Sequence, residues 1–210
     1  MNKYIDHTLL KADAKEAEIA KLCDEAKEYD FKAVCINPSW IEFSKKQLEN
    51  SDVLVCTVIG FPLGANTTEV KVFEAKDALS KGADEIDMVI NIGKLKDGDH
   101  DYVLNEIKEI KKAVKDNTLK VIIETALLSD EEISAVSKLC VKANADFVKT
   151  STGFSTSGAS VRVVRIIKAA VGDDALIKAA GGVRSNDDLK KMVEAGANRI
   201  GTSSGTKLMG

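Results

Sequence analysis

The chain has 210 residues, 44% of them hydrophobic, which suits one domain with a single buried core. Its 30 Lys and Arg residues nearly balance 33 Asp and Glu residues, and the formal net charge of −3 without a basic block argues against a nucleic-acid surface. No apolar run approaches the roughly 20 residues that span a bilayer, and Asp6 and His7 interrupt the N-terminal segment where a signal peptide would be apolar, so we expect a cytoplasmic protein.

Short β-branched runs alternate along the chain with longer amphipathic stretches, an order typical of a parallel sheet covered by helices. Eight runs predict strands, and seven helical stretches fill the gaps between them. The expected helix over residues 13–29 repeats apolar residues at helical spacing, and the helix over residues 102–114 does the same. The expected strands cover residues 4–8, 33–37, 53–59, 85–91, 120–125, 147–151, 176–180 and 199–202.

A weak repeat supports this count. Gly82-Ala83-Asp84, Asn144-Ala145-Asp146 and Gly196-Ala197-Asn198 each end an expected helix and precede an expected strand, with two strand-helix units between successive copies. Nothing in the composition marks a linker. The sequence therefore predicts an α/β fold, a (β/α)8 TIM barrel that forms a single domain over residues 1–210.

The four cysteines, Cys23, Cys35, Cys56 and Cys140, are scattered without a CxxC pair. Each lies in an apolar neighbourhood, so we expect reduced, mostly buried thiols rather than a disulfide or a zinc site. His7 and His100 do not form a metal pair with nearby carboxylates at helical spacing, which gives a zinc-dependent enzyme little support.

Charged residues occur within strands that should be apolar on both faces. By alternation, Glu85 and Asp87 face the barrel interior. Lys149 and Lys178 lie in the middle of two successive strands and should be neighbours. A lysine withdrawn from water beside a second ammonium loses basicity and can act as an amine nucleophile. The alternative is that the lysines only pair with Asp87 or Glu85, or extend to a rim.

Glycine-rich loops follow the last strands. Gly181-Gly182 precedes a helix whose predicted N-cap is Ser185, with Asp188 three residues later. The run from Gly201 to Gly205 follows the eighth strand. Loops after strands seven and eight commonly bind phosphate in such barrels, and Thr152-Gly153 after strand six could complete this site.

These segments together resemble the deoxyribose-phosphate aldolase family over nearly the whole chain. The most specific segments read Lys-Thr-Ser-Thr-Gly-Phe from Lys149 and Lys-Ala-Ala-Gly-Gly-Val-Arg from Lys178, beside Ile5–Lys11, Ala33–Pro38, Thr57–Gly64, Glu85–Val89 and Gly201–Ser204. The resemblance implies a carbon–carbon lyase of deoxyribonucleotide catabolism. As a class I aldolase of this family, the protein would reversibly cleave 2-deoxy-D-ribose 5-phosphate to acetaldehyde and D-glyceraldehyde 3-phosphate without metal or cofactor.

The resemblance also implies residue roles. Lys149 would form the Schiff base, Lys178 would lower the pKa of Lys149, and Asp87 with water would move protons. Asp6 resembles a further polar member of this network, and Cys35 resembles a family cysteine that the chemistry does not need. The residues expected to bind substrate are Asp6, Thr152, Gly153, Gly181, Gly182, Ser203 and Ser204, with Val183 and Arg184 in the same loop.

The partners implied are a phosphorylated sugar, short aldehydes and a second copy in a homodimer. The sequence departs from some family members after Thr206, where it has no tail ending in tyrosine. A related Schiff-base phospho-sugar aldolase or transaldolase would have the same imine-forming lysine and phosphate loops. A non-catalytic phosphosugar-binding barrel would retain only the loops. His7 is interpreted as a packed, hydrogen-bonded residue on the strand face opposite Asp6.

Overall fold

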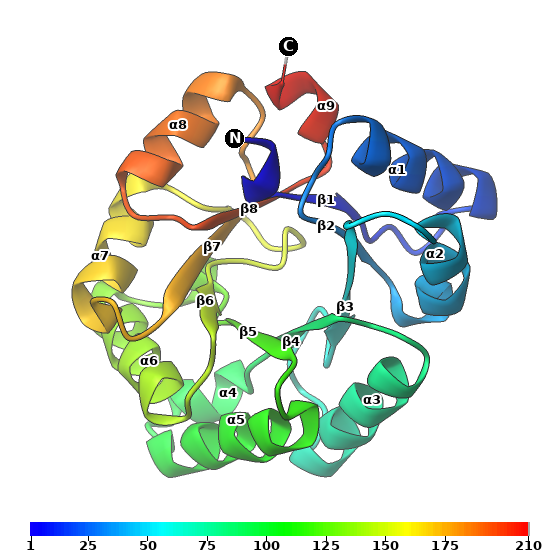
Figure 1. The fold of residues 1–210 in the computed structure, drawn as a ribbon. Coiled ribbons are helices and arrows are strands. Elements are labelled where there is room, and N and C mark those ends of the chain that lie inside the picture. The colour runs from blue at the N-terminus through cyan, green and yellow to red at the C-terminus, as the bar shows by residue number, and fades with distance from the viewer. Residues whose placement is uncertain (210) are drawn as a thin grey trace.

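The computed structural model describes residues 1–209, and its strands close into one parallel barrel in sequence order (Figure 1). The predicted fold class and the eight predicted strands are confirmed, while Gly210 lies outside the described residues. The strands are β1 (Ile5–Leu9), β2 (Ala33–Ile36), β3 (Leu54–Ile59), β4 (Glu85–Val89), β5 (Thr118–Ile122), β6 (Phe147–Lys149), β7 (Leu176–Ala180) and β8 (Arg199–Thr202).

The helices form a ring outside the barrel (Figure 1). Seven of them follow the predicted helical stretches, and α4 and α9 are additional short helices within residues 1–209. Three short 3-10 segments lie at Asn2–Tyr4, Pro38–Trp40 and Thr125–Leu127. The helices are α1 (Glu16–Glu28), α2 (Ile41–Gln47), α3 (Thr68–Ser80), α4 (Ile92–Lys96), α5 (His100–Val114), α6 (Asp130–Lys142), α7 (Val161–Val171), α8 (Asn186–Glu194) and α9 (Gly205–Leu208).

Four predicted strands end one to three residues later than the strands of the structure, namely those over residues 33–37, 85–91, 120–125 and 147–151. The expected strand over residues 120–125 is observed as Thr118–Ile122, because Glu124 adopts a left-handed backbone conformation and a 3-10 turn follows. The expected strand over residues 147–151 ends at Lys149. In both places the chain leaves the sheet at its carboxyl end to enter a loop.

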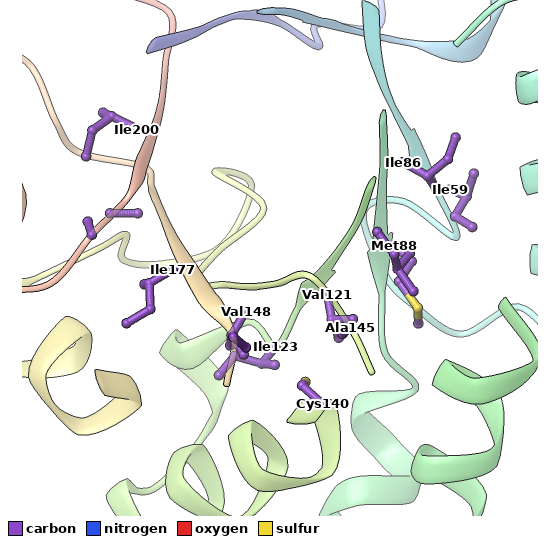
Figure 2. Packing of buried hydrophobic residues seen from close by; sticks show 14 of the residues in the cluster. Ile59, Ile86, Met88, Val121, Ile123, Cys140, Ala145, Val148, Ile177 and Ile200 are labelled. Atoms are coloured by element: carbon purple, nitrogen blue, oxygen red, sulfur yellow. The ribbon is translucent and has the colours of Figure 1, made fainter. Parts of the chain in front are cut away.

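Alternate residues of each strand point to opposite faces of the sheet, one toward the helices and the other toward the barrel interior. Ile86 and Met88 of β4 are fully buried in the layer between barrel and helices, whereas Glu85 and Asp87 of the same strand bond to side chains inside the barrel. Figure 2 shows other members of the outer layer, with Cys140 among them. Burial of each large aliphatic side chain in this layer contributes about 1.5–3 kcal/mol.

The sequence repeat marks three equivalent corners. Gly82, Asn144 and Gly196 take positive φ values of 103°, 58° and 117° after α3, α6 and α8, as the predicted helix ends require. The third residue of each copy accepts a hydrogen bond from a backbone N–H of the preceding strand. These donors are Val55 N to Asp84, Leu119 N to Asp146 and Ile177 N to Asn198. The repeat therefore fixes β4, β6 and β8 beside their neighbours.

Helix α8 begins as predicted. Ser185 is its N-cap, and its hydroxyl accepts from Asp188 N while the Asp188 carboxylate accepts from Ser185 N. The helix therefore starts directly after the Gly181-Gly182 loop. Among the described helices none is both long and apolar enough to cross a membrane.

Candidate active site

A cavity of about 310 Å³ opens at the carboxyl ends of β1, β6, β7 and β8. This is the end at which barrels of this architecture carry their ligand sites. The cavity brings together most of the residues singled out in the sequence, and Lys149 lies in its wall. Its lining residues are Thr8, Leu9, Leu10, Lys11, Lys149, Thr152, Gly153, Phe154, Ala180, Gly181, Gly182, Val183, Arg184, Gly201, Thr202, Ser203 and Ser204.

Lys149, Lys178 and Asp87 meet inside the barrel. Lys149 and Lys178 are register partners on β6 and β7, as their strand positions predicted. Each ammonium nitrogen donates to Oδ2 of Asp87 at 2.8 Å. Lys149 is 2% exposed and lines the cavity, whereas Lys178 is fully buried and does not. Of the two lysines, only Lys149 can meet a molecule in the cavity.

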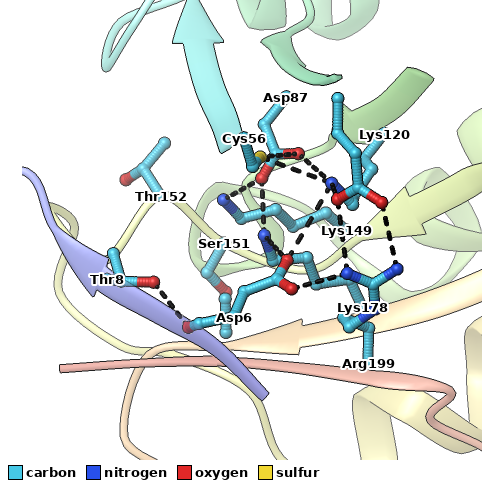
Figure 3. A network of polar contacts seen from close by, with 12 residues as sticks. Asp6, Thr8, Cys56, Asp87, Lys120, Lys149, Ser151, Thr152, Lys178 and Arg199 are labelled. Carbon is cyan, nitrogen blue, oxygen red and sulfur yellow. Dashed lines mark hydrogen bonds and ion pairs between the residues drawn. The ribbon is translucent and has the colours of Figure 1, made fainter. Parts of the chain in front are cut away.

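These three residues belong to a larger group of buried charges that we call the ionic layer (Figure 3). Its members are Asp6, Glu85, Asp87, Lys120, Lys149, Lys178 and Arg199. Lys120 donates to Glu85 at 2.5 Å and to Asp87 at 3.0 Å. Arg199 donates to Asp6 at 2.6 Å and to Glu85 at 3.1 Å.

Sequence reasoning missed Lys120 and Arg199. Both are charged residues at inward positions of strands, which is the signal that had identified Lys149 and Lys178. They lie at the beginning of the expected strands, however, where a charged residue indicates the end of a strand and not a buried position. The structure begins β5 two residues before Lys120 and so places this lysine within the sheet.

The layer changes the proton affinities of its members. Burial alone would raise the carboxyl pKa of Asp87, but Lys120, Lys149 and Lys178 hold it well below its ordinary value. Burial also opposes ionisation of Asp6, yet Lys178 and Arg199 lower its pKa to about 2. For Lys178, burial favours the neutral amine, but Asp6 and Asp87 outweigh it and raise its pKa well above the ordinary value. Lys178 therefore stays protonated.

Counting charge separates Lys149 from the rest of the layer. With every group ionised, the layer holds four cations and three carboxylates. A buried layer is most stable when its charges balance, because an uncompensated charge is costly in a low dielectric. Without Lys149 the layer holds three cations and three carboxylates, and Lys149 is the lysine of the layer that lines the cavity.

Asp6, which was grouped with the substrate-binding residues, lies within the ionic layer and does not line the cavity. Its Oδ2 is 2.5 Å from Lys178 Nζ. This position fits the other part of the expectation, that Asp6 belongs to the polar network around the lysines. His7, the next residue of β1, points to the opposite side and its Nε2 bonds to Glu25 of α1 at 2.7 Å.

The glycine loops meet on one side of the cavity. Gly153, Gly181 and Gly182 take φ values of 88°, 80° and 82°, a region that other residues rarely adopt. A side chain at Gly158 would come within 2.2 Å of the Gly181 carbonyl, so the loops after β6 and β7 touch through their backbones. Ser203 and Ser204 follow β8 and line the same cavity. Backbone N–H groups and hydroxyls therefore converge where an anion could bind.

Glu124 is a third residue that sequence reasoning missed. It is 3% exposed and has φ 52°, an uncommon value for a residue with a side chain. Its Oε2 accepts hydrogen bonds from the hydroxyl and the backbone N–H of Thr152. Glu124 thereby holds the start of the loop that carries Gly153 and Phe154. A charged residue inside the expected strand over residues 120–125 was the available signal.

The environment expected for the cysteines is corrected in part. All four are free and buried, as predicted. The neighbourhood of Cys56 is not apolar, because its Sγ lies 3.1 Å from Asp87 Oδ1 and 3.3 Å from Lys120 Nζ. The reason is that Cys56 occupies an inward position of β3, beside the charged interior of β4.

Within residues 1–209, two groups of side chains have the spacing of metal ligands: Cys35 with Cys56 and Asp87, and Asp6 with Cys56 and Glu85. Every carboxylate in these groups already pairs with a lysine or arginine of the ionic layer. A cation would have to displace those partners, so the donor sets do not form a ready metal site.

Comparison with known proteins gives a match along the whole length. The family described as DeoC/LacD family aldolase matches residues 1–209. A deoxyribose-phosphate aldolase of Finegoldia magna is 59% identical over 209 residues, covering 100% of this chain and 98% of that protein. The enzyme of the same name from Staphylococcus carnosus is 58% identical over 207 residues, covering 99% of this chain and 94% of that protein.

The fold is similarly close to solved structures. A tetrameric deoxyribose-phosphate aldolase of Aeropyrum pernix superposes with a TM-score of 0.92 at 36% identity, covering 99% of this chain and 88% of that chain.

Proposed function

The chain belongs to the DeoC/LacD aldolase family, and from that premise we propose that it reversibly cleaves 2-deoxy-D-ribose 5-phosphate to acetaldehyde and D-glyceraldehyde 3-phosphate through a Schiff base on Lys149. The chain is thus an aldolase, a carbon–carbon lyase. The observation that carries the proposal is the position of Lys149: it joins the ionic layer and also lines the cavity.

The reaction begins at the amine of Lys149. Its nitrogen attacks the C1 aldehyde carbon of the open-chain sugar, and loss of water leaves a protonated imine. That cation replaces the charge of an ammonium at the same place, so Asp87 at 2.8 Å remains its counter-ion. The protonated imine then accepts the electron pair of the C2–C3 bond when the C3 hydroxyl loses its proton. D-glyceraldehyde 3-phosphate leaves and an enamine remains on Lys149.

Asp87 and Lys178 support the proton transfers. Asp87 stays a carboxylate beside three lysines, so its proposed part is to accept a hydrogen bond from the water that carries protons at the imine and enamine stages. Lys178 keeps its proton and holds Asp87 Oδ2 from the other side. Protonation of the enamine carbon gives the imine of acetaldehyde, and water releases the aldehyde.

We assign the phosphate end of the substrate to the part of the cavity that the glycine-rich loops line. The residues proposed to bind it are those of the loops after β6, β7 and β8: Thr152, Gly153, Gly181, Gly182, Ser203 and Ser204. Their backbone N–H groups and hydroxyls suit a dianion. Arg184 at the cavity rim adds a positive charge on the same side.

Reduction of the imine tests the mechanism. The chain is mixed with acetaldehyde and sodium borohydride in excess EDTA, digested and mapped by mass spectrometry. The expected result is an ethyl group on Lys149 and none on Lys178 or Lys71, two buried lysines that do not line the cavity. Turnover of 2-deoxyribose 5-phosphate in EDTA, lost in Lys149→Ala, completes the test. Modification at another lysine, or an active Lys149→Ala, contradicts the assignment.

A cytoplasmic homodimer remains a prediction. The related enzyme of Aeropyrum pernix is described as tetrameric, so family membership leaves the number of subunits open. Sedimentation equilibrium of the full chain over a range of concentrations would decide among monomer, dimer and tetramer.

A further inference from the structure

Two cysteines lie side by side inside the barrel. Cys35 of β2 and Cys56 of β3 are register partners on neighbouring parallel strands. Such strands lie about 4.8 Å apart, within the range of about 4.4–6.8 Å between Cα atoms that a disulfide spans. Both residues belong to one small interior cluster, and their thiols are within hydrogen-bonding reach of each other. The strand register therefore places side by side two cysteines that are far apart in the sequence.

This pair is connected to the ionic layer. Cys56 Sγ donates to Asp87 Oδ1 at 3.1 Å, and Lys120 Nζ lies 3.3 Å from the same sulfur (Figure 3). Asp87 in turn accepts from Lys149 at 2.8 Å. A covalent change at Cys56 therefore alters the hydrogen bonds of the carboxylate beside the proposed nucleophile.

The pair also differs from the other two cysteines in acidity. Burial raises the thiol pKa of Cys23 to about 11 and of Cys140 to about 12. For Cys35 the hydrogen bond with Cys56 outweighs burial and lowers the pKa to about 7. Because the thiolate is the nucleophilic form, Cys35 is the cysteine with the greater reactivity near neutral pH.

We propose that Cys35 and Cys56 are an oxidation site, at which a small peroxide forms a reversible intramolecular disulfide that disturbs the ionic layer and lowers aldolase activity. The activity readout rests on the proposed function, but formation of the disulfide does not. Both sulfurs are buried, and Leu10 belongs to their cluster and also lines the cavity. Leu10 is therefore the side chain that has to move for hydrogen peroxide to pass from the cavity to the pair.

The chemistry is a two-electron oxidation. The Cys35 thiolate attacks one oxygen of hydrogen peroxide, the O–O bond breaks, and the departing hydroxide takes a proton to become water. The sulfur of Cys56 then attacks the sulfenic acid of Cys35, the S–S bond forms, and a second water leaves. Two thiols become one disulfide, the peroxide is reduced to two waters, and the layer keeps its charge. Cys56 no longer has a proton to donate to Asp87.

The experiment treats the intact chain with hydrogen peroxide, blocks free thiols, and maps peptides without reduction. The expected product is a Cys35–Cys56 cross-link with a mass lower by two hydrogen atoms. We expect kcat/KM to fall at least about tenfold, since a hydrogen bond to a charged group is lost, and to recover with dithiothreitol. Absence of the cross-link, or a cross-link with unchanged kcat/KM, overturns the proposal.

Variants separate this pair from the remaining thiols. Cys35→Ala should resist peroxide, whereas Cys140→Ala, the matched control, keeps both members of the pair and should lose activity as the wild type does. An equal peroxide-induced loss in Cys35→Ala contradicts the proposal. If the untreated wild type has no aldolase activity, the proposed function fails, while peptide mapping still tests the disulfide.

Discussion

Within residues 1–209, lysine–carboxylate ion pairs with both partners buried lie in two separate regions, and their contrast indicates what makes a lysine chemically useful. The ionic layer fills the barrel interior, while Lys71 of α3 and Glu106 of α5 form a pair outside the barrel. Lys71 donates to Glu106 at 2.6 Å and to the carbonyls of Gly64 and Val89 at 2.8 Å each. Its three donors are thereby satisfied, whereas Lys149 donates to Asp87 alone and faces a cavity.

The proton affinities of the two regions move in opposite directions. In the isolated pair, burial lowers the pKa of Lys71 and raises the pKa of Glu106, since one partner compensates each charge only in part. In the ionic layer several cations surround each carboxylate, and the pKa of Asp87 falls despite complete burial. A network therefore sustains ionised groups that a single pair sustains less well, and burial alone does not identify a catalytic lysine.

The largest expected effect is a loss of activity on substitution of Lys149 in the ionic layer, which substitution of Lys71 should not cause. Lys149→Met should lower kcat by at least about a thousandfold, because Lys149 is the lysine of the ionic layer that lines the cavity and its amine forms the imine. The variant should remain folded, since an apolar side chain of similar length leaves the remaining cations and carboxylates balanced. Steady-state kinetics and thermal unfolding measured on the same preparation check both parts. An unfolded Lys149→Met would contradict the charge count.

Asp87→Asn should reduce kcat by about a hundredfold to a thousandfold, because it removes the counter-ion and the charged hydrogen-bond acceptor together. We expect KM to change much less, since Asp87 does not line the cavity. Saturation kinetics of 2-deoxyribose 5-phosphate cleavage provide the measurement. A rise in KM at constant kcat would instead make Asp87 a residue that only shapes the binding site.

Lys71→Met should affect stability rather than chemistry. Removing one partner leaves the Glu106 carboxylate buried without its ion pair, which costs about 3–5 kcal/mol of the free energy of unfolding. Urea unfolding gives this quantity. The double variant Lys71→Met with Glu106→Leu is the matched control and should recover most of the loss. A double variant as unstable as the single one would argue against an unpaired charge as the cause.

Acid should weaken the ionic layer in a defined range. The folded-state pKa of Asp6 is about 2 against an ordinary 3.8, so its contribution of about 2 kcal/mol is present above pH 3.8 and is lost as the pH falls through about 2. Asp6→Asn removes this dependence. The free energies of unfolding of variant and wild type should therefore converge by about 2 kcal/mol on acidification, as followed by urea unfolding at several pH values. A constant difference would exclude this assignment.

The smallest effect is expected at Glu124. Glu124→Gln replaces a charged acceptor of the Thr152 N–H and hydroxyl with a neutral one, at a cost of about 1 kcal/mol. Because Thr152 begins the loop of the phosphate side, KM should rise about fivefold while kcat remains close to wild type. Steady-state measurement of kcat and KM tests this prediction. A fall in kcat at constant KM would instead show that Glu124 acts in the catalytic step.

Local pattern was enough to predict the strands, their inward faces and the pairing of Lys149 with Lys178. Alternation along a strand and helical periodicity depend on near neighbours only, and successive strands of a parallel barrel lie side by side. The corners at Gly82, Asn144 and Gly196 were visible for the same reason. Strand ends were less certain, because the turn at Glu124 depends on its bonds to Thr152 in the following loop.

Only the tertiary structure decided which charges share the interior and which cysteines meet. Arg199 reaches Asp6 across 193 residues of sequence, and Cys35 faces Cys56 because the strands align in one register. Neither relation leaves a mark on local sequence. The sequence alone thus determined the barrel and its candidate nucleophile, while closure of the barrel determined the electrostatic environment, because coulombic energies depend on distances in space.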